Sequence, residues 1–148
     1  MPLPQDLLRL ARELVDRNPA APVEADLRRG VSTGYYALFH LLVQEATTQL
    51  VAVASLRARV ARSFDHKIMK IVCQEHARLS PNPAGQLVTA AGQVVPTALQ
   101  DIASEFVALQ QARYQADYDT SAPVTQAQAD IDVRRAELRP RTTALAGR

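Results

Sequence analysis

The long stretch from about Val23 to about Leu50 constrains the fold most, because two apolar stripes run along it at helical spacing. The stripes consist of Leu27, Val31, Tyr35, Leu38 and Leu42, and of Tyr36, Phe39, Val43, Ala46 and Leu50. A helix that is apolar around most of its circumference lies at the centre of a bundle rather than on its surface. The sequence therefore predicts an all-α fold built around this helix.

Further segments have the apolar spacing and the boundary residues of helices. They are residues 6–17, 65–79, 97–119 and 125–140, separated by proline-containing loops. The helix at 65–79 begins at the potential N-cap Asp65 and carries the apolar residues Ile68, Ile71, Val72 and Cys73. Residues 51–63 either continue the long helix or form a short one. We expect an up-and-down bundle of four or five helices, one domain over residues 1–140 with a flexible tail over 141–148.

Composition and charge exclude few classes of function. The formal net charge of the 148 residues is +2, with Lys67 and Lys70 as the only lysines, so charge alone does not call for a nucleic-acid partner. The preference for arginine favours phosphate binding, but a GC-rich coding bias produces the same preference. The single cysteine, Cys73, excludes an internal disulfide and is typical of a reducing compartment. Without a signal pattern or a long apolar span, we expect a cytoplasmic protein away from the membrane.

The core stripe of the 97–119 helix becomes polar toward its C-terminal end. Heptad steps lead from Leu99 and Phe106 to Arg113, and from Ala103 and Gln110 to Asp117. Arg113 and Asp117 are neighbours four residues apart and can form an ion pair. Either the helix leaves the core here and the pair is solvated, or the bundle holds a polar site at this end.

A histidine interrupts the apolar surface of the central helix. His40 follows Arg29 and Tyr36 along nearly one line of that helix. It is either a core histidine with a hydrogen-bonding partner or a proton carrier. Cys73 and His76 are spaced to share a metal, but no second ligand pair accompanies them. No phosphate-binding glycine loop is present either, so we expect no cofactor and no metal.

Three segments, taken in order, resemble the HEPN family of small helical bundles. Residues 28–40 (RRGVSTGYYALFH) are similar to the family's Tyr-Tyr-Ala-x-Phe-His run. Residues 65–67 (DHK) resemble a His-Lys step that opens the following helix, and residues 113–119 (RYQADYD) resemble an Arg-x-x-Ala-Asp-Tyr motif. A helix with Thr125 as its N-cap follows at the expected place. The resemblance covers about residues 28–139 and implies a helical bundle that works as a homodimer.

The resemblance also implies a chemistry, from which this chain departs. Many HEPN proteins are ribonucleases whose Arg-x(4–6)-His motif binds phosphate through arginine and moves protons through histidine. Here the matching position after Arg113 is Tyr118, and a tyrosine is a poor general base at neutral pH. The Arg-x6-His spacing occurs at Arg59 and His66, before the helix at 65–79. His66 could instead complete a composite site with Arg113.

Two main functions follow from this resemblance. The first is a nucleic-acid-binding protein or ribonuclease, with Arg113, Asp117, Tyr118, His66 and His40 in the site. The residues expected to contact RNA are Arg29, Arg59, Arg62 and Lys67. The second is a non-catalytic module of a toxin–antitoxin or defence system that binds a nucleotidyltransferase or a toxin or antitoxin subunit. The lost histidine favours the second function. A third reading gives Arg113, Asp117 and Tyr118 a structural role only.

Overall fold

Helix α2 (Glu24–Leu50) is the central element of the computed structural model, which describes residues 2–137. It is 27 residues long, and side chains from both predicted stripes are buried. The buried side chains include Leu27, Val31, Tyr35, Leu38, Phe39 and Val43. The helix ends where Val51 adopts an extended backbone conformation. The predicted long helix is therefore confirmed, with an end at residue 50.

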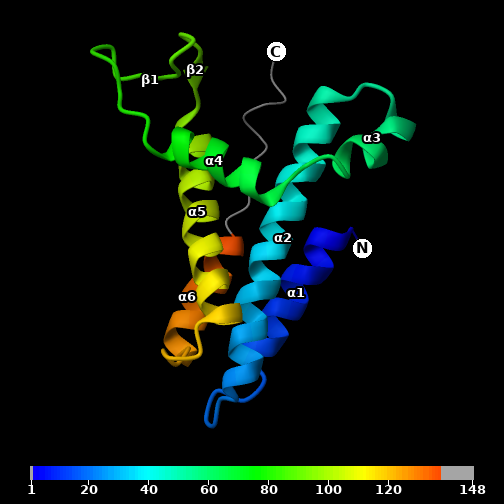
Figure 1. The fold of residues 1–148 in the computed structure, drawn as a ribbon, viewed down its shortest axis with the longest axis vertical. Coiled ribbons are helices and arrows are strands. Elements are labelled where there is room, and N and C mark those ends of the chain that lie inside the picture. The colour runs from blue at the N-terminus through cyan, green and yellow to red at the C-terminus, as the bar shows by residue number, and fades with distance from the viewer. Residues whose placement is uncertain (1, 138–148) are drawn as a thin grey trace.

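Three helices pack beside α2 to form the bundle: α1 (Leu3–Val15), α5 (Thr97–Tyr118) and α6 (Gln126–Glu137). They run up and down along the long axis of the molecule (Figure 1). All four helices contribute to the core, through fully buried side chains such as Val15, Tyr35, Phe106 and Val133. The predicted all-α bundle is confirmed. The predicted tail at residues 141–148 lies outside the described residues.

Two shorter helices, α3 (Ala54–Ala61) and α4 (His66–Ala77), follow the break after α2. The segment at 51–63 is thus a short separate helix rather than a continuation of α2. Asp65 caps α4 as predicted, because its carboxylate accepts hydrogen bonds from the backbone N–H groups of Lys67 (2.7 Å) and Ile68 (3.1 Å). In Figure 1, α4 crosses near the upper end of the bundle and packs against α5.

Because α4 crosses the bundle, most of its apolar residues are exposed. Ile68, Ile71 and Val72 are 58%, 42% and 44% exposed, whereas Cys73 is buried. A helix that lies across the end of a bundle contacts it along a narrow strip only, so most of its circumference stays in solvent. The apolar sequence of α4 therefore does not mark a core helix.

A small antiparallel hairpin joins α4 to α5, which the sequence analysis did not predict. It consists of β1 (Leu87–Val88) and β2 (Val94–Val95), with one buried residue in each strand. Gly92 supplies the positive φ of 79° in the turn, and its N–H donates to the Thr89 carbonyl at 2.8 Å. Two-residue strands are too short to produce a readable alternation of apolar and polar residues.

Arg28 fixes the C-terminal end of α5 against α2. Its side chain is 16% exposed, and it pairs with Glu24 one turn away. Its guanidinium donates to four backbone carbonyls at the end of α5 and in the loop that follows. These belong to Gln115 (3.2 Å), Ala116 (3.0 Å), Asp119 (2.9 Å) and Ala122 (2.8 Å). The last carbonyls of a helix lack partners within the helix, so Arg28 holds the end of α5 that carries Arg113 and Asp117.

Candidate functional site

Arg113 and Asp117 form the centre of a polar cluster between α5 and α2. The Arg113 Nε donates to Asp117 Oδ2 at 3.1 Å, and Arg113 Nη2 donates to the Tyr36 hydroxyl at 3.1 Å. Asp117 Oδ2 also accepts a hydrogen bond from the Ser32 hydroxyl at 3.2 Å. The pair is part-buried, with 21% of the Arg113 side chain and 19% of the Asp117 side chain exposed. The polar positions in the core stripe of α5 therefore meet α2 instead of only facing solvent.

The Arg113 guanidinium also lies over aromatic rings. Its Cζ is 5.5 Å from the ring centroid of Tyr35, 5.4 Å from that of Tyr36 and 5.9 Å from that of Tyr118. A cation over the face of an aromatic ring is attracted by the ring quadrupole. Burial opposes the charge of Arg113, but Tyr36, Asp117 and the neighbouring tyrosines outweigh it and raise its pKa. Arg113 is thus a fixed positive charge that remains partly accessible.

His66 reaches the same cluster from the first residue of α4. Its Nδ1 is 2.8 Å from the Tyr35 hydroxyl. Its ring stacks on Phe39, with centroids 3.7 Å apart and an interplanar angle of 21°, and it meets the Tyr36 ring edge-on. The structure thus brings His66 and Arg113 to the same two tyrosines, although they lie on different helices.

The environment keeps His66 neutral at neutral pH. Burial, the Arg113 charge and His40 lower the pKa of His66, while Asp65 opposes the shift. Burial also raises the pKa of the Tyr35 hydroxyl to about 12, so Tyr35 keeps its proton. A neutral imidazole beside a fixed cation has the charge states required for general base catalysis next to a phosphate-binding group.

His40 lies at the edge of this cluster. Its ring packs edge-on against Phe39, with centroids 5.5 Å apart. Within the described chain no hydrogen bond involves its side chain, so no buried polar partner stabilises it there. His40 acts on the cluster through its effect on His66, and it does not contact Arg113.

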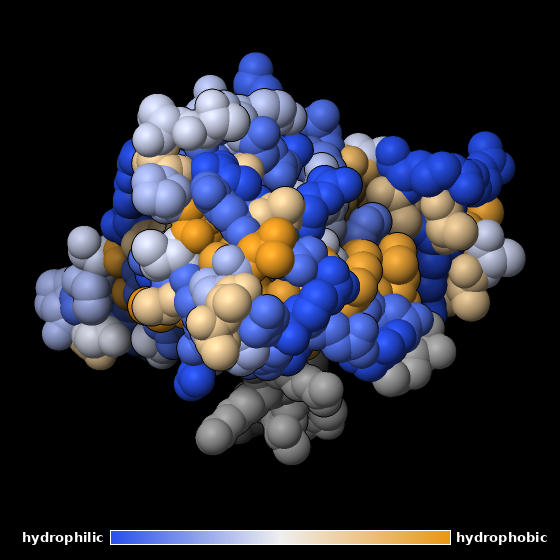
Figure 2. Space-filling view, turned by 90° about the horizontal axis from the view of Figure 1, so that it is seen from below, coloured by the Kyte–Doolittle hydropathy of each residue, from blue (hydrophilic) through white to orange (hydrophobic). Residues whose placement is uncertain are grey.

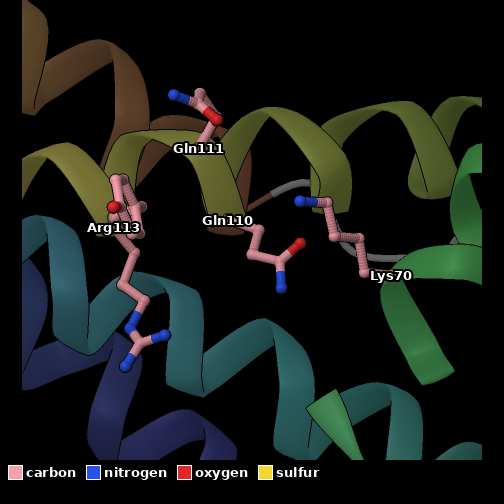
Figure 3. Close-up of a pocket in the computed structure, with 5 residues that line it drawn as sticks. Lys70, Gln110, Gln111 and Arg113 are labelled. Carbon is pink, nitrogen blue, oxygen red and sulfur yellow. The ribbon is translucent and has the colours of Figure 1, made fainter. Parts of the chain in front are cut away.

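A pocket of about 240 Å³ opens beside Arg113 (Figure 3). It is lined by Lys70 of α4 and by Gln110, Gln111, Arg113 and Tyr114 of α5. In Figure 3 the Gln110 amide points into the space between α5 and α2, and Gln111 points away from it. Gln110 Oε1 is buried without a hydrogen-bond partner. The pocket is smaller than the sites that enclose drug-sized ligands, and its volume suits one phosphate or one base.

The four residues predicted to contact nucleic acid are all exposed, but they do not form one group. Arg29 lies one turn before Ser32 on α2, and Lys67 follows His66 on α4. Arg59 and Arg62 lie on or directly after α3, which packs against α2. Within residues 2–137, no ion pair occupies any of these four cations, and no interaction links α3 with Arg113.

Tyr118 lies on the exposed side of the cluster. It is 64% exposed, and its ring meets that of Tyr114, itself exposed, at 5.4 Å with a tilt of 51°. Tyr118 contacts Arg113 through its ring face rather than through a hydrogen bond. The position where the HEPN resemblance expects a histidine therefore carries an aromatic surface.

Sequence reasoning missed several members of this cluster. Tyr35 and Phe39 were assigned to the core stripes, yet they hold His66 in place. Lys70 and Tyr114 were not singled out, and both line the pocket. Tyr35 carried a readable signal, because a tyrosine in a core stripe needs a partner for its hydroxyl.

No protein-family model, curated protein or solved structure matches the chain. The described residues contain no group of three or more His, Cys, Asp or Glu side chains that could hold a metal ion. Along residues 2–137, no helix is both long enough and apolar enough to cross a membrane. The HEPN resemblance thus remains a prediction from the three sequence segments.

Proposed function

We propose that this chain is a non-catalytic, HEPN-like module that binds single-stranded RNA at the pocket between α4 and α5, beside Arg113. The observation that supports this most is the partly exposed Arg113 guanidinium, held over three tyrosine rings beside a pocket shared with Lys70. A fixed cation binds a phosphate, and exposed tyrosine rings offer stacking surfaces for bases. The cluster combines both requirements of single-strand binding.

The positions of the other side chains fit this role. Tyr114 and Tyr118 are both exposed and lie one helical turn apart, so successive bases can stack on them. Lys70 and Arg113 line the same pocket from two helices and give it two cations for the phosphates of an RNA strand. Arg29 is exposed on α2, one turn from the Ser32–Asp117 contact, and offers a further cation to the phosphate backbone.

We propose a non-catalytic role because polar atoms of both Arg113 and His66 already have partners within the protein. Asp117 and Tyr36 occupy Nε and Nη2 of Arg113. The Tyr35 hydroxyl occupies His66 Nδ1, and Phe39 covers one face of the ring. Tyr118 stands where a proton-transferring histidine would be expected, and it offers a ring instead.

Fluorescence anisotropy with a labelled oligouridine tests the proposal. Tyr118→Ala should weaken binding by about 5- to 150-fold, the loss that corresponds to about 1–3 kcal/mol for one stacked base. Arg113→Ala should weaken binding and reduce the salt dependence by about one phosphate contact. The matched control is Arg9→Ala, which removes an exposed arginine from α1. If both variants bind RNA as tightly as the control, the proposal is wrong.

A metal-independent endoribonuclease is the second candidate. It is favoured by the neutral His66 in the same cluster as Arg113. In this reaction His66 would take the proton of the RNA 2′-hydroxyl while the 2′-oxygen attacks phosphorus. Arg113 would stabilise the phosphate charge, the P–O5′ bond would break to give a 2′,3′-cyclic phosphate, and water would protonate the leaving 5′-oxygen.

Incubation of structured and single-stranded RNA with the purified protein distinguishes the two candidates. Cleavage that is lost in folded Arg113→Ala and His66→Ala variants, and kept in Arg9→Ala, would support the ribonuclease. Binding without cleavage would support the non-catalytic module. The homodimer, and a toxin–antitoxin or defence setting with a nucleotidyltransferase or a toxin or antitoxin partner, remain proposals implied by the resemblance.

A further inference from the structure

A concentration of exposed aliphatic side chains lies along residues 50–72. Of the 14 large hydrophobic residues exposed in the described chain, six belong to this segment. They are Leu50, Val53, Leu56, Ile68, Ile71 and Val72, and we call them, with the rest of α3 and α4, the α3–α4 surface. Seen from below, the molecule shows several apolar areas separated by hydrophilic ones (Figure 2). A concentration of exposed apolar residues on a water-soluble surface indicates an interaction site.

Helix α3 contacts α2 but has little packing for a short helix. It is eight residues long, and none of its residues is buried. In Figure 1 it projects away from the four-helix bundle. Isolated helices shorter than about 12–15 residues are marginal in water, and packing against another surface usually stabilises them. A partner that covers α3 would supply that packing.

The charge of this surface differs in sign from that of the remaining protein. Residues 54–79 contain six Lys or Arg residues and two Asp or Glu residues, a net charge of +4. The other described residues contain eight Lys or Arg and 13 Asp or Glu, a net charge of −5. Among residues 2–137, none of the ion pairs includes a cation of residues 54–79. Their arginines all lie within residues 9–28 or 113–135. The cations of the α3–α4 surface are thus not neutralised by ion pairs within residues 2–137, although Arg57 donates a hydrogen bond to the Val51 carbonyl at 2.9 Å.

We propose that the α3–α4 surface binds an acidic amphipathic α-helix of another protein. On α4, Ile68, Ile71 and Val72 are spaced three and four residues apart, the pattern that packs against a second helix. Lys67 and Arg78 flank them and can pair with the partner's carboxylates. The inference does not depend on RNA binding beside Arg113.

Other occupants fit this surface less well. Two copies of the chain joined through the same surface by a two-fold axis would place +4 against +4. The six exposed side chains are all aliphatic, whereas bases stack on aromatic rings. A lipid surface would have to bury Glu75, which lies on the exposed face of α4 beside Ile71 and Val72. A protein partner can pair Glu75 with a cation.

The experiment uses a labelled synthetic peptide with leucines at helical a and d positions and glutamates elsewhere, titrated with the full chain by fluorescence anisotropy. Ile71→Ser and Arg59→Glu should each weaken peptide binding about tenfold or more. The first removes an aliphatic side chain that the peptide would bury, and the second reverses a charge that would pair with a glutamate. The matched controls are Ile131→Ser and Arg9→Glu, at exposed positions on α6 and α1. They should bind the peptide like the wild-type protein.

Hydrogen exchange provides a second measurement in the wild-type protein. Saturating peptide should slow amide exchange in residues 54–61, since α3 gains a packing partner. Three results would overturn the proposal: equal binding of a sequence-scrambled peptide, no protection of α3, or binding that Ile71→Ser leaves unchanged. Peptide-independent dimerisation that Ile71→Ser abolishes would assign the surface to a second copy instead. Binding to anionic lipid vesicles that Ile71→Ser abolishes, with no peptide binding, would assign it to a membrane.

Discussion

Two glycines on one face of α2 should respond to alanine in opposite directions. Gly30 and Gly34 are four residues apart, and both are buried. At Gly30 an added Cβ would lie 2.6 Å from Val15 Cγ2 and 3.2 Å from the Ala11 carbonyl oxygen of α1. At Gly34 the nearest atom would be the Cβ of Ala136 in α6, at the ordinary contact distance of 3.6 Å. Only Gly30 is required by the close approach of α1.

The magnitudes follow from two competing effects. Replacing glycine with alanine in a helix interior stabilises it by about 1 kcal/mol. Overpacking a well-packed core costs about 1–3 kcal/mol. The contact at Gly30 involves a stiff β-branched side chain that is 1% exposed and a backbone carbonyl. We therefore take the upper end of that cost. The expected changes in the free energy of unfolding are a loss of about 2 kcal/mol for Gly30→Ala and a gain of about 1 kcal/mol for Gly34→Ala.

Urea unfolding followed by far-UV circular dichroism measures both changes. In a thermal scan, Gly30→Ala should lower the Tm by about 6 °C and Gly34→Ala should raise it by about 3 °C. If Gly30→Ala stabilised the protein, α1 and α2 would not pack as closely as the structure shows. If Gly34→Ala destabilised it, the space between α2 and α6 would be misassigned. A confirmed Gly34→Ala would also provide a more stable background for the Arg113 variants.

Three further predictions concern single side chains. Arg28→Lys should lower the free energy of unfolding, measured by urea titration, by about 2 kcal/mol, because a lysine cannot donate to four carbonyls at once. An unchanged midpoint of the titration would show that solvent satisfies these carbonyls equally well. The lowered pKa of His66 means that the unfolded chain takes up this proton at a higher pH than the folded protein does. The free energy of unfolding should therefore fall as the pH drops through about 6.5, and His66→Gln should reduce that fall; the same pH dependence in the variant would contradict the assignment. Burial raises the pKa of the Cys73 thiol to about 11. Iodoacetamide should therefore modify Cys73 at neutral pH far more slowly in the folded protein than in urea. Equal rates of modification would show that Cys73 is not buried.

Much of the bundle was predictable because its helices bury their own apolar stripes. The stripes of α2, the Asp65 cap of α4 and the pairing of Arg113 with Asp117 all depend on residues two to four positions apart. Such spacings are set by the geometry of the helix itself. The polar change in the stripe of α5 left two interpretations open, a solvated pair or a polar site, and the contacts of Arg113 and Asp117 with α2 come from the tertiary structure.

The composition of that cluster depends on contacts between distant segments. His66 and Tyr35 are 31 residues apart, and Arg113 and Tyr36 are 77 apart. The contact of His66 with Tyr35 requires α4 to cross the end of the bundle, and that of Arg113 with Tyr36 requires α5 to pack beside α2. No local pattern encodes either arrangement. Arg28 is similar: next to Arg29 in sequence, it serves as a cap for α5, while Arg29 stays exposed.

The sequence by itself determined, to within a few residues, where the helices of the bundle lie and most of the residues of α2 that face inward, since helical periodicity records burial within each segment. Leu50, assigned to a core stripe, is instead 77% exposed, because it is the last residue of α2. Only the tertiary structure decided that Ile68, Ile71 and Val72 face solvent, and that His66 and Arg113 share two tyrosines. The physical reason is that an apolar helical stripe has the same spacing whether its partner is in the same chain or in another molecule.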